Sequence, residues 1–578
     1  MPNTEELIRR YGPSFCVLPW KHLHLCDTGA CKICCATSAL RDQFGRRLTV
    51  YKNPLETIWN SEAMREVRRA MVAGEMVPDC AYCRDTEALG GYSRRLRENQ
   101  SWETGWVARE GVSIAGLKTE AGRNDYFVPY APFDMDIEID NRCNLSCRMC
   151  GADRSSRIEN DPVHRRWAGR LQTLPRWVDN EMALAPERVI DGIYVGFYPA
   201  GDVQKAAALW TRGKAEIRLP EVNERLTSLE IRLTEESIAR ELRLFLNDAV
   251  VYESAGSGIP RRDITVDLGS YYQDLCLRFE SDTVVSPDFN GPLGVGLLRL
   301  AVRRDKKTRP ASQLMYSRFP ARNHWMMEDD FLFKELFPPG VKQKGLKIVG
   351  GEPLFNPNVL RVLHHLAEKG DSREQRISFT TNGTVYNEKV FRLAKKFKCY
   401  IVAVSIDAIG PGLEYIRHGV RWRTLEKNIG RMASTRNVHL IASTTLQAYN
   451  ALEIVEVFRF CDRSGLECFS SVVVNPGYLG IAVLPPEVRT VAARRLKAYI
   501  DDGRPGFAGN KQSALTLAHA LESPATAFAP AELRRFMLFN NDLDRSRKEN
   551  IRDAFPELVD LIERAGYPWI GEYLFCEG

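Results

Sequence analysis

Several features that would place the chain in a large functional class are missing from its 578 residues. No apolar run reaches the length of a membrane span, and residues 1–6 lack the basic start and apolar core of a signal peptide. Glycine-rich phosphate loops, a dinucleotide-binding motif and a catalytic-triad pattern are also absent. We therefore expect a cytoplasmic protein without a membrane span, whose chemistry uses another kind of site.

The chain also lacks an excess of charge of either sign. Its 80 basic and 74 acidic residues leave a net charge of only +6, spread without long runs, so we expect no nucleic-acid partner. A hydrophobic content of 44% and a charged content of 27% are typical of a globular protein. The length exceeds what a single core sustains, which predicts about two to four domains.

Cysteine, in contrast, is abundant. The chain has 15 cysteines, and seven of them precede residue 84. In a chain that has the character of a cytosolic protein, this distribution indicates metal sites rather than disulfides.

One loop carries three of these cysteines at short spacing: Cys143, Cys147 and Cys150. Three thiolates in one loop suit three corners of an iron-sulfur cube better than a tetrahedral zinc, and such a cube keeps one iron open. The preceding residues 133–140 alternate apolar and acidic side chains, which predicts a strand that ends at the loop. From the spacing alone, a zinc knuckle or three unrelated thiols remain alternatives.

Further strands are predicted downstream. Residues 345–349 form an apolar strand followed by Gly350, Gly351, Glu352 and Pro353. Adjacent glycines allow close approach to the backbone, and a carboxylate at a strand end can accept a hydrogen bond from an ammonium group. Strands at residues 376–381, 401–405, 439–445 and 469–474 follow with the spacing of alternating strands and helices.

These motifs, in this order, resemble the radical S-adenosylmethionine (SAM) superfamily. The resemblance implies that Cys143, Cys147 and Cys150 hold a [4Fe-4S] cluster and that SAM chelates the open iron. One electron would then cleave SAM to methionine and a 5'-deoxyadenosyl radical, which removes hydrogen from a substrate C–H bond. It also implies an α/β fold, a partial (β/α)6 TIM-like barrel built from residues 126–170 and 319–480.

The same resemblance implies a set of cofactor-binding residues. Met149 stands where the family usually has an aromatic residue against the adenine, an apolar contact that methionine can also make. The implied residues are Met149, Gly350, Gly351, Glu352, Pro353, Thr381, Asn382, Ser405, Asp407, Arg417 and Thr444.

Residues 1–125 are predicted to form a second cysteine site. Residues 15–35 have the pattern of a β-hairpin with its turn at 27–29, in which we expect one of His22 and His24 to face the interior and the other solvent. A Cys-x2-Cys pair with hairpin cysteines makes a four-thiolate site, and spacing does not separate zinc from iron-sulfur.

The order of motifs in this segment resembles the SPASM or twitch module of radical SAM proteins, although family members usually carry it after the barrel. The motifs are Cys16, Pro19-Trp20, Gly29-x4-Cys34, residues 58–61 and Cys80-x2-Cys83. The resemblance implies an auxiliary [4Fe-4S] cluster on Cys16, Cys34, Cys80 and Cys83. Cys26, Cys31 and Cys35 remain as spare thiols, ligands of a second cluster, or, for Cys35, a substitute for Cys34.

Residues 171–318 interrupt the barrel with short alternating runs that predict an inserted β-sandwich of about eight strands. The segment is similar to β-sandwich modules of some bacterial glycosyltransferases and surface-polysaccharide enzymes, which implies docking of a glycan or a partner protein. Four aromatic residues either stack on a sugar or pack within the sandwich: Tyr198, Trp210, Tyr271 and Tyr272.

Residues 481–578 are predicted to form covering helices, and Cys576 is either an extra cluster ligand or a free thiol. Together these features predict a radical SAM oxidoreductase acting by dehydrogenation, epimerisation or cross-linking on a small-molecule, glycan or peptide substrate. Flavodoxin or ferredoxin would supply electrons, and Cys399, Cys461 or Cys468 could return a hydrogen atom. The alternatives are a peptide-modifying radical SAM maturase and a non-catalytic, metal-stabilised binding protein.

Overall fold

The described part of the chain forms two compact units. The computed structural model describes residues 4–43, 47–88, 92–106, 112–151, 154–167, 181–183, 194–197, 209–219, 224–234, 241–247, 249–254, 262–272, 275–285, 292–293, 295–304, 324–338, 340–341, 343–368, 372–473, 476–502, 506–524 and 526–574. The first unit comprises Met1–Gln43, Leu48–Gly169 and Asn323–Gly578; the second comprises Phe44–Arg47 and Arg170–Arg322.

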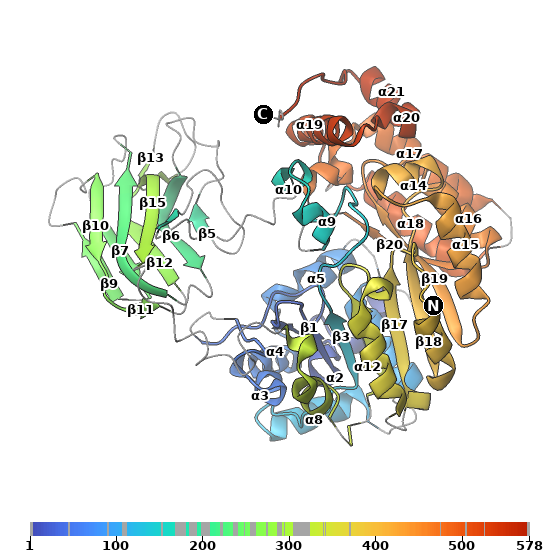
Figure 1. Cartoon of the computed structure of the whole chain (residues 1–578), viewed down its shortest axis with the longest axis horizontal. Helices are drawn as coiled ribbons and strands as arrows, with labels where there is room; N and C mark the ends of the chain where they lie inside the picture. Colours follow the sequence, from blue (N-terminus) through green and yellow to red (C-terminus); the bar gives the residue numbers. More distant parts are fainter. Residues whose placement is uncertain are drawn as a thin grey trace. The chain divides into compact units, whose positions relative to one another are not determined.

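The first unit is built on an eight-stranded sheet of order β2-β1-β3-β16-β17-β18-β19-β20 (Figure 1). The strands are β2 (Cys31–Lys32), β1 (His22–Leu25), β3 (Asp134–Glu138), β16 (Gly345–Val349), β17 (Arg376–Thr381), β18 (Cys399–Ser405), β19 (Val438–Leu446) and β20 (Glu467–Val472). Every neighbouring pair is parallel except β1 and β2. The strands expected from residue 133 onward are therefore present in a mixed α/β unit, whereas the partial barrel stays a prediction.

The N-terminal hairpin belongs to this same sheet. β1 and β2 pair antiparallel, with His24 opposite Lys32, as the sequence predicts. β1 also pairs parallel with β3, with His24 opposite Asp136. The expected cysteine module thus shares a sheet with the strand that leads to Cys143.

Alternation along the strands separates two faces of the sheet. Met135 and Ile137 of β3 and Val402 of β18 point to one face and are buried. Three amphipathic helices flank the strands on that side: α12 (Pro357–Glu368), α15 (Trp422–Ala433) and α16 (Ile454–Arg463). The opposite face carries polar side chains such as Asp136 and Glu138, so the sheet offers functional groups on that side.

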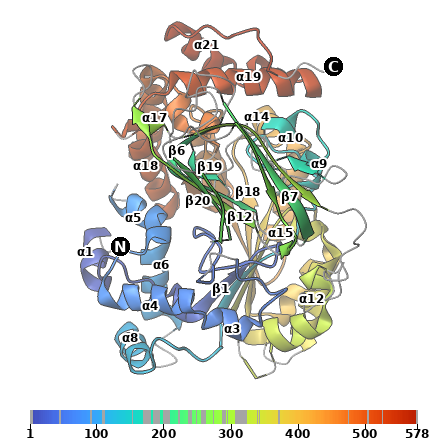
Figure 2. The same cartoon turned by 90° about the vertical axis from the view of Figure 1, so that its left-hand side faces the viewer.

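Helices from both ends of the chain complete the first unit (Figures 1 and 2). The N-terminal set contains α1 (Thr4–Tyr11), α2 (Leu18–Lys21), α3 (Leu55–Trp59), α4 (Glu62–Ala73), α5 (Ala81–Ala88), α6 (Arg94–Ser101) and α8 (Ile114–Arg123). The helical C-terminal region contains α17 (Pro486–Asp501), α18 (Ala508–Glu522), α19 (Pro530–Arg547), α20 (Ile551–Ala554) and α21 (Pro556–Arg564). The short helices α9 (Ser156–Glu159), α10 (His164–Trp167), α13 (Glu388–Arg392) and α14 (Pro411–Ile416) connect the rest. No helix among the described residues is long and apolar enough to cross a membrane.

Local signals explain where these helices begin and end. In α4, the Ser61 hydroxyl accepts a hydrogen bond from the Met64 N–H at the first turn. The helix ends at Gly74, whose φ of +81° suits glycine.

The second unit is antiparallel throughout its described strands. Its sheet runs β10-β7-β15-β6-β12-β8-β9, with β4, β5 and β11 paired beside it. The strands are β4 (Glu181–Ala183), β5 (Tyr194–Phe197), β6 (Leu209–Leu219), β7 (Glu224–Leu233), β8 (Leu242–Leu246), β9 (Ala249–Glu253), β10 (Asp263–Asp267), β11 (Tyr271–Tyr272), β12 (Leu275–Ser281), β13 (Val284–Val285), β14 (Pro292–Leu293) and β15 (Gly296–Arg304).

The core of the second unit follows the alternation of its strands. Leu275, Leu277 and Phe279 of β12 are buried together with the matching residues of β7, β8 and β15. Trp210 is 1% exposed, so it packs and does not offer a ring to a sugar. Tyr198 and the side chains of Tyr271 and Tyr272 lie outside the described parts, and the sandwich arrangement stays a prediction.

Candidate functional site

The loop that follows β3 is held against the end of β16. The Gly351 N–H donates to the Asp140 carbonyl at 2.7 Å, and the Glu352 N–H donates to the Arg142 carbonyl at 2.8 Å. A Cβ on Gly351 would lie 2.3 Å from the Arg142 oxygen, and one on Gly350, where φ is +134°, would lie 2.8 Å from the Asp140 oxygen. The two glycines therefore let the cysteine loop approach the strand end, and their contact with a ligand stays a prediction.

The loop gathers its three thiols. All three are free; Cys147 is buried, and Cys143 and Cys150 are half-buried. A hydrogen bond with the Cys150 thiol, together with the Arg417 cation, lowers the pKa of Cys147, while burial raises the pKa of Cys143 to about 11. The hydrogen bond places the Cys147 and Cys150 thiols side by side, and Cys143 is on the same loop.

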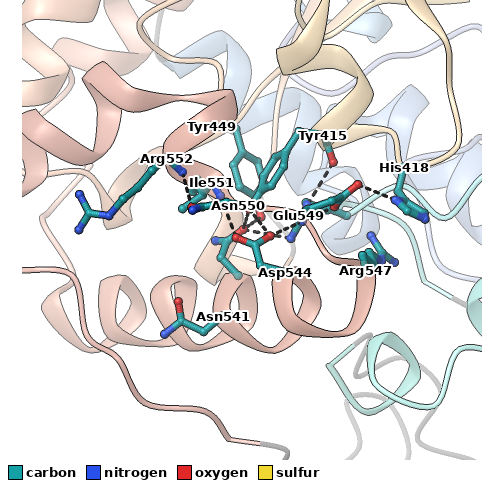
Figure 3. A network of polar contacts seen from close by, with 12 residues as sticks. Tyr415, His418, Tyr449, Asn541, Asp544, Arg547, Glu549, Asn550, Ile551 and Arg552 are labelled. Carbon is teal, nitrogen blue, oxygen red and sulfur yellow. Dashed lines mark hydrogen bonds and ion pairs between the residues drawn. The ribbon is translucent and has the colours of Figure 1, made fainter.

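Arg148, between the second and third cysteines, anchors the loop to the C-terminal region. Two of its partners there, Asp544 and Glu549, lie near Tyr415 and His418 (Figure 3). The Arg148 side chain is fully buried and donates to Asp544 Oδ1 at 2.6 Å and to Glu549 Oε2 at 2.7 Å. A third bond reaches Asn540 Oδ1 at 3.2 Å, and the guanidinium lies 3.7 Å from the centre of the Tyr415 ring. The spacing of the cysteines gave no sign of this anchor.

Backbone hydrogen bonds also join the cysteine loop to the end of α14 and the residues that follow it. The Ser146 N–H donates to the His418 carbonyl at 2.9 Å, and the Arg148 N–H donates to the Ile416 carbonyl at 2.8 Å. His418 Nδ1 in turn lies 2.6 Å from Glu549 Oε1. The segment after α14 and the end of α19 thus fix the position of Cys147 between them.

The carboxylate of Glu352, which we expect to contact an ammonium group, accepts hydrogen bonds from other residues of the chain. They come from the Thr381 hydroxyl at 2.7 Å, the Asn382 N–H at 2.7 Å and the Leu354 N–H at 3.0 Å. Burial raises the pKa of Glu352. Asn382 also reaches the cysteine loop, because its Nδ2 lies 3.8 Å from Cys143 Sγ. Glu352 therefore positions the Thr381–Asn382 segment, and its contact with a ligand stays a prediction.

Asp407 and Arg417 form a buried pair beside Cys147. Arg417 Nε and Nη2 each lie 2.7 Å from Asp407 Oδ2, and Arg417 Nη1 lies 4.0 Å from Cys147 Sγ. The other Asp407 oxygen accepts the Thr445 N–H at 2.9 Å. Asp407 thus holds a cation against the thiols, at the end of β18 where half-buried Ser405 also lies.

Two buried polar atoms at the end of β19 have no hydrogen-bond partner among the described residues: Thr444 Oγ1 and Gln447 Oε1. Gln447 Nε2 lies 3.7 Å from Met149 Sδ, on the cysteine loop. Because buried polar groups are normally paired, these atoms fit a polar ligand that docks beside Met149. Thr444 and Met149 were expected here, whereas Gln447 was missed because it lies just beyond the predicted strand.

The four cysteines expected to hold the auxiliary cluster line one small cavity: Cys16, Cys34, Cys80 and Cys83. All four thiols are free, and burial raises the pKa of Cys16 and of Cys34. Arg94 and Arg95 line the same cavity. The donor set therefore fits a four-thiolate metal centre.

The remaining N-terminal cysteines lie elsewhere in this segment. Exposed Cys35 accepts from Arg94 Nη1 at 2.8 Å, and buried Cys31 is on β2. Buried Cys26 follows β1, and Cys576 lies outside the described residues.

The expectation that His22 and His24 face opposite sides is wrong. Residues two apart on a strand share a face, and both side chains are buried, at 2% and 1% exposure. His22 Nε2 lies 3.3 Å from Asp136 Oδ1, and His24 Nε2 lies 3.1 Å from Glu138 Oε1. Both histidines therefore sit on the polar face of the sheet.

Two curated relatives share part of their sequence with this chain. GTP 3',8-cyclases of Rhizobium leguminosarum bv. trifolii (strain WSM2304) and Rhizobium etli (strain CIAT 652) are 25% and 24% identical to it over 145 residues. The match covers 24% of this chain and 40% of each relative, so the chain spans less than half of their length. The similarity supports the resemblance to the radical SAM superfamily, whereas no protein-family model matches the chain.

Solved structures give weaker likenesses. Streptococcus suis SuiB bound to S-adenosylmethionine is 20% identical, with a TM-score of 0.21 over 27% of this chain and 34% of that chain. Native anSMEcpe with bound AdoMet is 17% identical, with a TM-score of 0.23 over 27% and 45%. The CBM36-1 domain of a xylanase from the hindgut metagenome of Trinervitermes trinervoides is 14% identical, with a TM-score of 0.16 over 22% and 98%. Scores this low do not establish a shared fold.

Proposed function

We propose that this chain is a radical SAM enzyme in which Cys143, Cys147 and Cys150 hold a [4Fe-4S] cluster. The supporting observation is a single loop with three free thiols, close to the Arg417 cation and to the Asn382 amide. When bound, the cluster and SAM would supply a 5'-deoxyadenosyl radical that can remove hydrogen from an unreactive C–H bond.

The chain's own residues have defined tasks in this proposal. Arg417 offsets part of the negative charge of the thiolates, and Asp407 holds it in place at 2.7 Å. Asn382 donates to Cys143 Sγ, and such bonds to a ligating sulfur tune a cluster's reduction potential. Arg148 keeps the loop in one position, which a site with three ligands and an open iron requires.

SAM would dock beside Met149, near two buried oxygen atoms that have no hydrogen-bond partner among the described residues, Thr444 Oγ1 and Gln447 Oε1. Thr444 and Gln447 would hydrogen-bond the ligand, and the Met149 thioether would pack against its apolar part. The remaining sides of the proposed SAM site would be formed by the backbone at Gly350 and Gly351 together with Pro353 and Ser405.

A second [4Fe-4S] cluster would be held by Cys16, Cys34, Cys80 and Cys83, which line one cavity. With four protein ligands this auxiliary cluster has no open iron, so it would transfer electrons. Arg94 and Arg95 would offset its charge. Such a centre suits an oxidoreductase that takes an electron from a substrate radical, whereas epimerisation would need a hydrogen donor.

The proposed domains follow from these two centres. Residues 1–125 would form the auxiliary module, residues 126–170 and 319–480 the partial barrel, residues 171–318 the β-sandwich insert and residues 481–578 the helical cover. A flavodoxin or ferredoxin would deliver the reducing electron. The substrate would be a small molecule, a glycan or a peptide.

Anaerobic reconstitution tests the assignment of both centres. Wild-type protein should hold about eight irons per chain and release 5'-deoxyadenosine from SAM under dithionite. A variant with Cys143, Cys147 and Cys150 all replaced by alanine should keep about four irons and release none. Cys276→Ser, in the second unit, is the matched control and should behave as wild type. Release of 5'-deoxyadenosine by the triple variant would overturn the proposal.

A further inference from the structure

Three further metal-ligating side chains, which the proposed function does not use, lie together at the carboxyl ends of β1 and β3. They are His24, Cys26 and Glu138, and one ligand atom of each lies within 4.8 Å of the other two. All three are buried, at 1%, 5% and 6% exposure. A buried nitrogen, sulfur and oxygen donor at such close range form a compact mixed set.

This donor set has the chemistry of a zinc site. Zn²⁺ takes histidine nitrogen at about 2.0 Å, carboxylate oxygen at about 2.1 Å and thiolate sulfur at about 2.3 Å. In tetrahedral geometry those bonds place ligand atoms roughly 3.3–3.8 Å apart. The observed donors therefore need only a small movement toward a common centre. Three protein ligands would leave the fourth position open.

The surroundings of His24 support this reading. Its Nδ1 has no hydrogen-bond partner among the described residues and lies 3.6 Å from Asp136 Oδ2. A histidine that ligates a metal through one ring nitrogen usually donates the other N–H to a carboxylate. Asp136 is itself fixed by His22 at 3.3 Å and by Arg94 at 3.2 Å. The carboxylate needed to orient a ligating imidazole is thus already in place.

Charged side chains surround the three donors. Asp136 Oδ2 lies 3.6 Å from His24 Nδ1, and Glu138 Oε1 lies 3.1 Å from His24 Nε2. Arg154 lies 3.0 Å from Glu138 Oε1 and is 39% exposed, so it can turn into solvent when a metal enters.

We propose that His24, Cys26 and Glu138 bind one Zn²⁺ ion, whose open fourth position accepts water or an oxygen or nitrogen atom of a substrate. The site faces the polar side of the sheet, beside the strand that leads to the cysteine loop. It is independent of the iron-sulfur centres, and its occupancy is measured without any assay of SAM cleavage.

Metal analysis of the full-length, iron-reconstituted protein tests the site. After incubation with Zn²⁺ alone and desalting, wild-type protein should hold one zinc per chain in addition to its iron. Cys26→Ser should lower zinc below one fifth of an equivalent while iron stays unchanged, which shows that the chain still folds. Cys276→Ser should retain one zinc. Wild-type protein without stoichiometric zinc, or full zinc in Cys26→Ser, overturns the proposal.

Spectroscopy and affinity give two further readouts. Zinc-edge X-ray absorption should show one sulfur with two or three nitrogen or oxygen neighbours; three or four sulfurs would place the ion in a cysteine site and refute the assignment. Arg154→Gln removes the competing cation, so a chelator competition should show about two- to fivefold tighter binding, whereas Glu138→Gln should bind at least tenfold more weakly. Unchanged affinity in both variants would contradict the proposed ligands.

Discussion

The two compact units bury very different side chains. In the described part of the second unit the buried apolar residues are aliphatic apart from Trp210 and Phe279, and the buried polar residues are Thr211 and Thr234. The first unit buries many ionisable residues, among them Lys21, His22, His24, Arg68, Arg95, Asp136, Glu138, Arg148, Glu352 and Asp407. Burying ionisable groups is expensive unless each is paired, and such groups concentrate where a protein does chemistry. The first unit therefore depends on pairing among its buried charges, and the second depends on apolar packing.

The charges of the second unit illustrate the contrast. Arg232 pairs with Asp263 at 2.6 Å, and Arg243 pairs with Glu253 at 2.7 Å, but all four side chains are more than half exposed. Exposed pairs contribute about 0–1 kcal/mol. The Arg148 network in the first unit is buried, so the loss of one partner there has a far larger cost.

The largest effect is expected for Arg148→Met. Removing the guanidinium leaves Asp544 and Glu549 without the buried cation that joins them, and breaking a buried pair costs about 3–5 kcal/mol. Urea unfolding should show this loss, and the reconstituted protein should lose iron from the three-cysteine loop.

The control for that variant lies in the same loop. Arg142→Met removes an exposed pair with Asp140 and should change stability by less than about 1 kcal/mol. Equal stability of the two variants would mean that burial of Arg148 does not matter.

In the second unit, Leu277→Ala tests a core built on packing. Leu277 is fully buried, and truncating a buried leucine costs about 2–5 kcal/mol. Amide hydrogen exchange should speed up in β6, β8 and β12, which pair around it. Iron content should not change; a fall in iron would show that the two units are not energetically separate.

Thr444→Val tests whether an unpaired buried group serves a ligand. Its hydroxyl has no hydrogen-bond partner among the described residues, so stability should be unchanged or slightly higher. The KM for SAM should rise about fivefold, since one hydrogen bond contributes about 1 kcal/mol. Thr445→Val, whose hydroxyl contacts Ser471 at 3.3 Å, is the matched control and should keep the wild-type KM.

The smallest effect is expected for Arg232→Gln on the surface of the second unit. Its pair with Asp263 is exposed on both sides, so the unfolding free energy should not change measurably. Denaturant titration at low and high salt measures it. A measurable change would show that this surface pair contributes more than its exposure implies.

Strand positions could be predicted from the sequence because alternation is a local signal. Met135 and Ile137 point to the buried face, as the pattern of residues 133–140 requires. The strands β17 and β18 end at Thr381 and Ser405, as the sequence predicts. The meeting of Cys16 with Cys80 around one cavity was also indicated in advance, by a family resemblance rather than by periodicity.

Contacts between distant segments could not be predicted in this way. Nothing near His24 in the sequence specifies its position opposite Asp136, since parallel pairing joins segments more than 100 residues apart. The same holds for Arg148 and its partners Asn540 and Asp544 on α19 and Glu549 just after it. The close approach of the Arg142 backbone to Gly351 was missed for a related reason, because it joins loops far apart in the sequence.

The Arg148 anchor also sets an order of events during synthesis. Asp544 and Glu549 follow Arg148 by 396 and 401 residues, so the ribosome must translate most of the protein before the arginine can find them. A nascent chain emerging at about 5–20 residues per second spends roughly 20–80 s with that arginine unpaired. Delivery of the proposed iron-sulfur cluster to this loop should therefore be post-translational, and a stalled polypeptide that ends before α19 should not retain iron there.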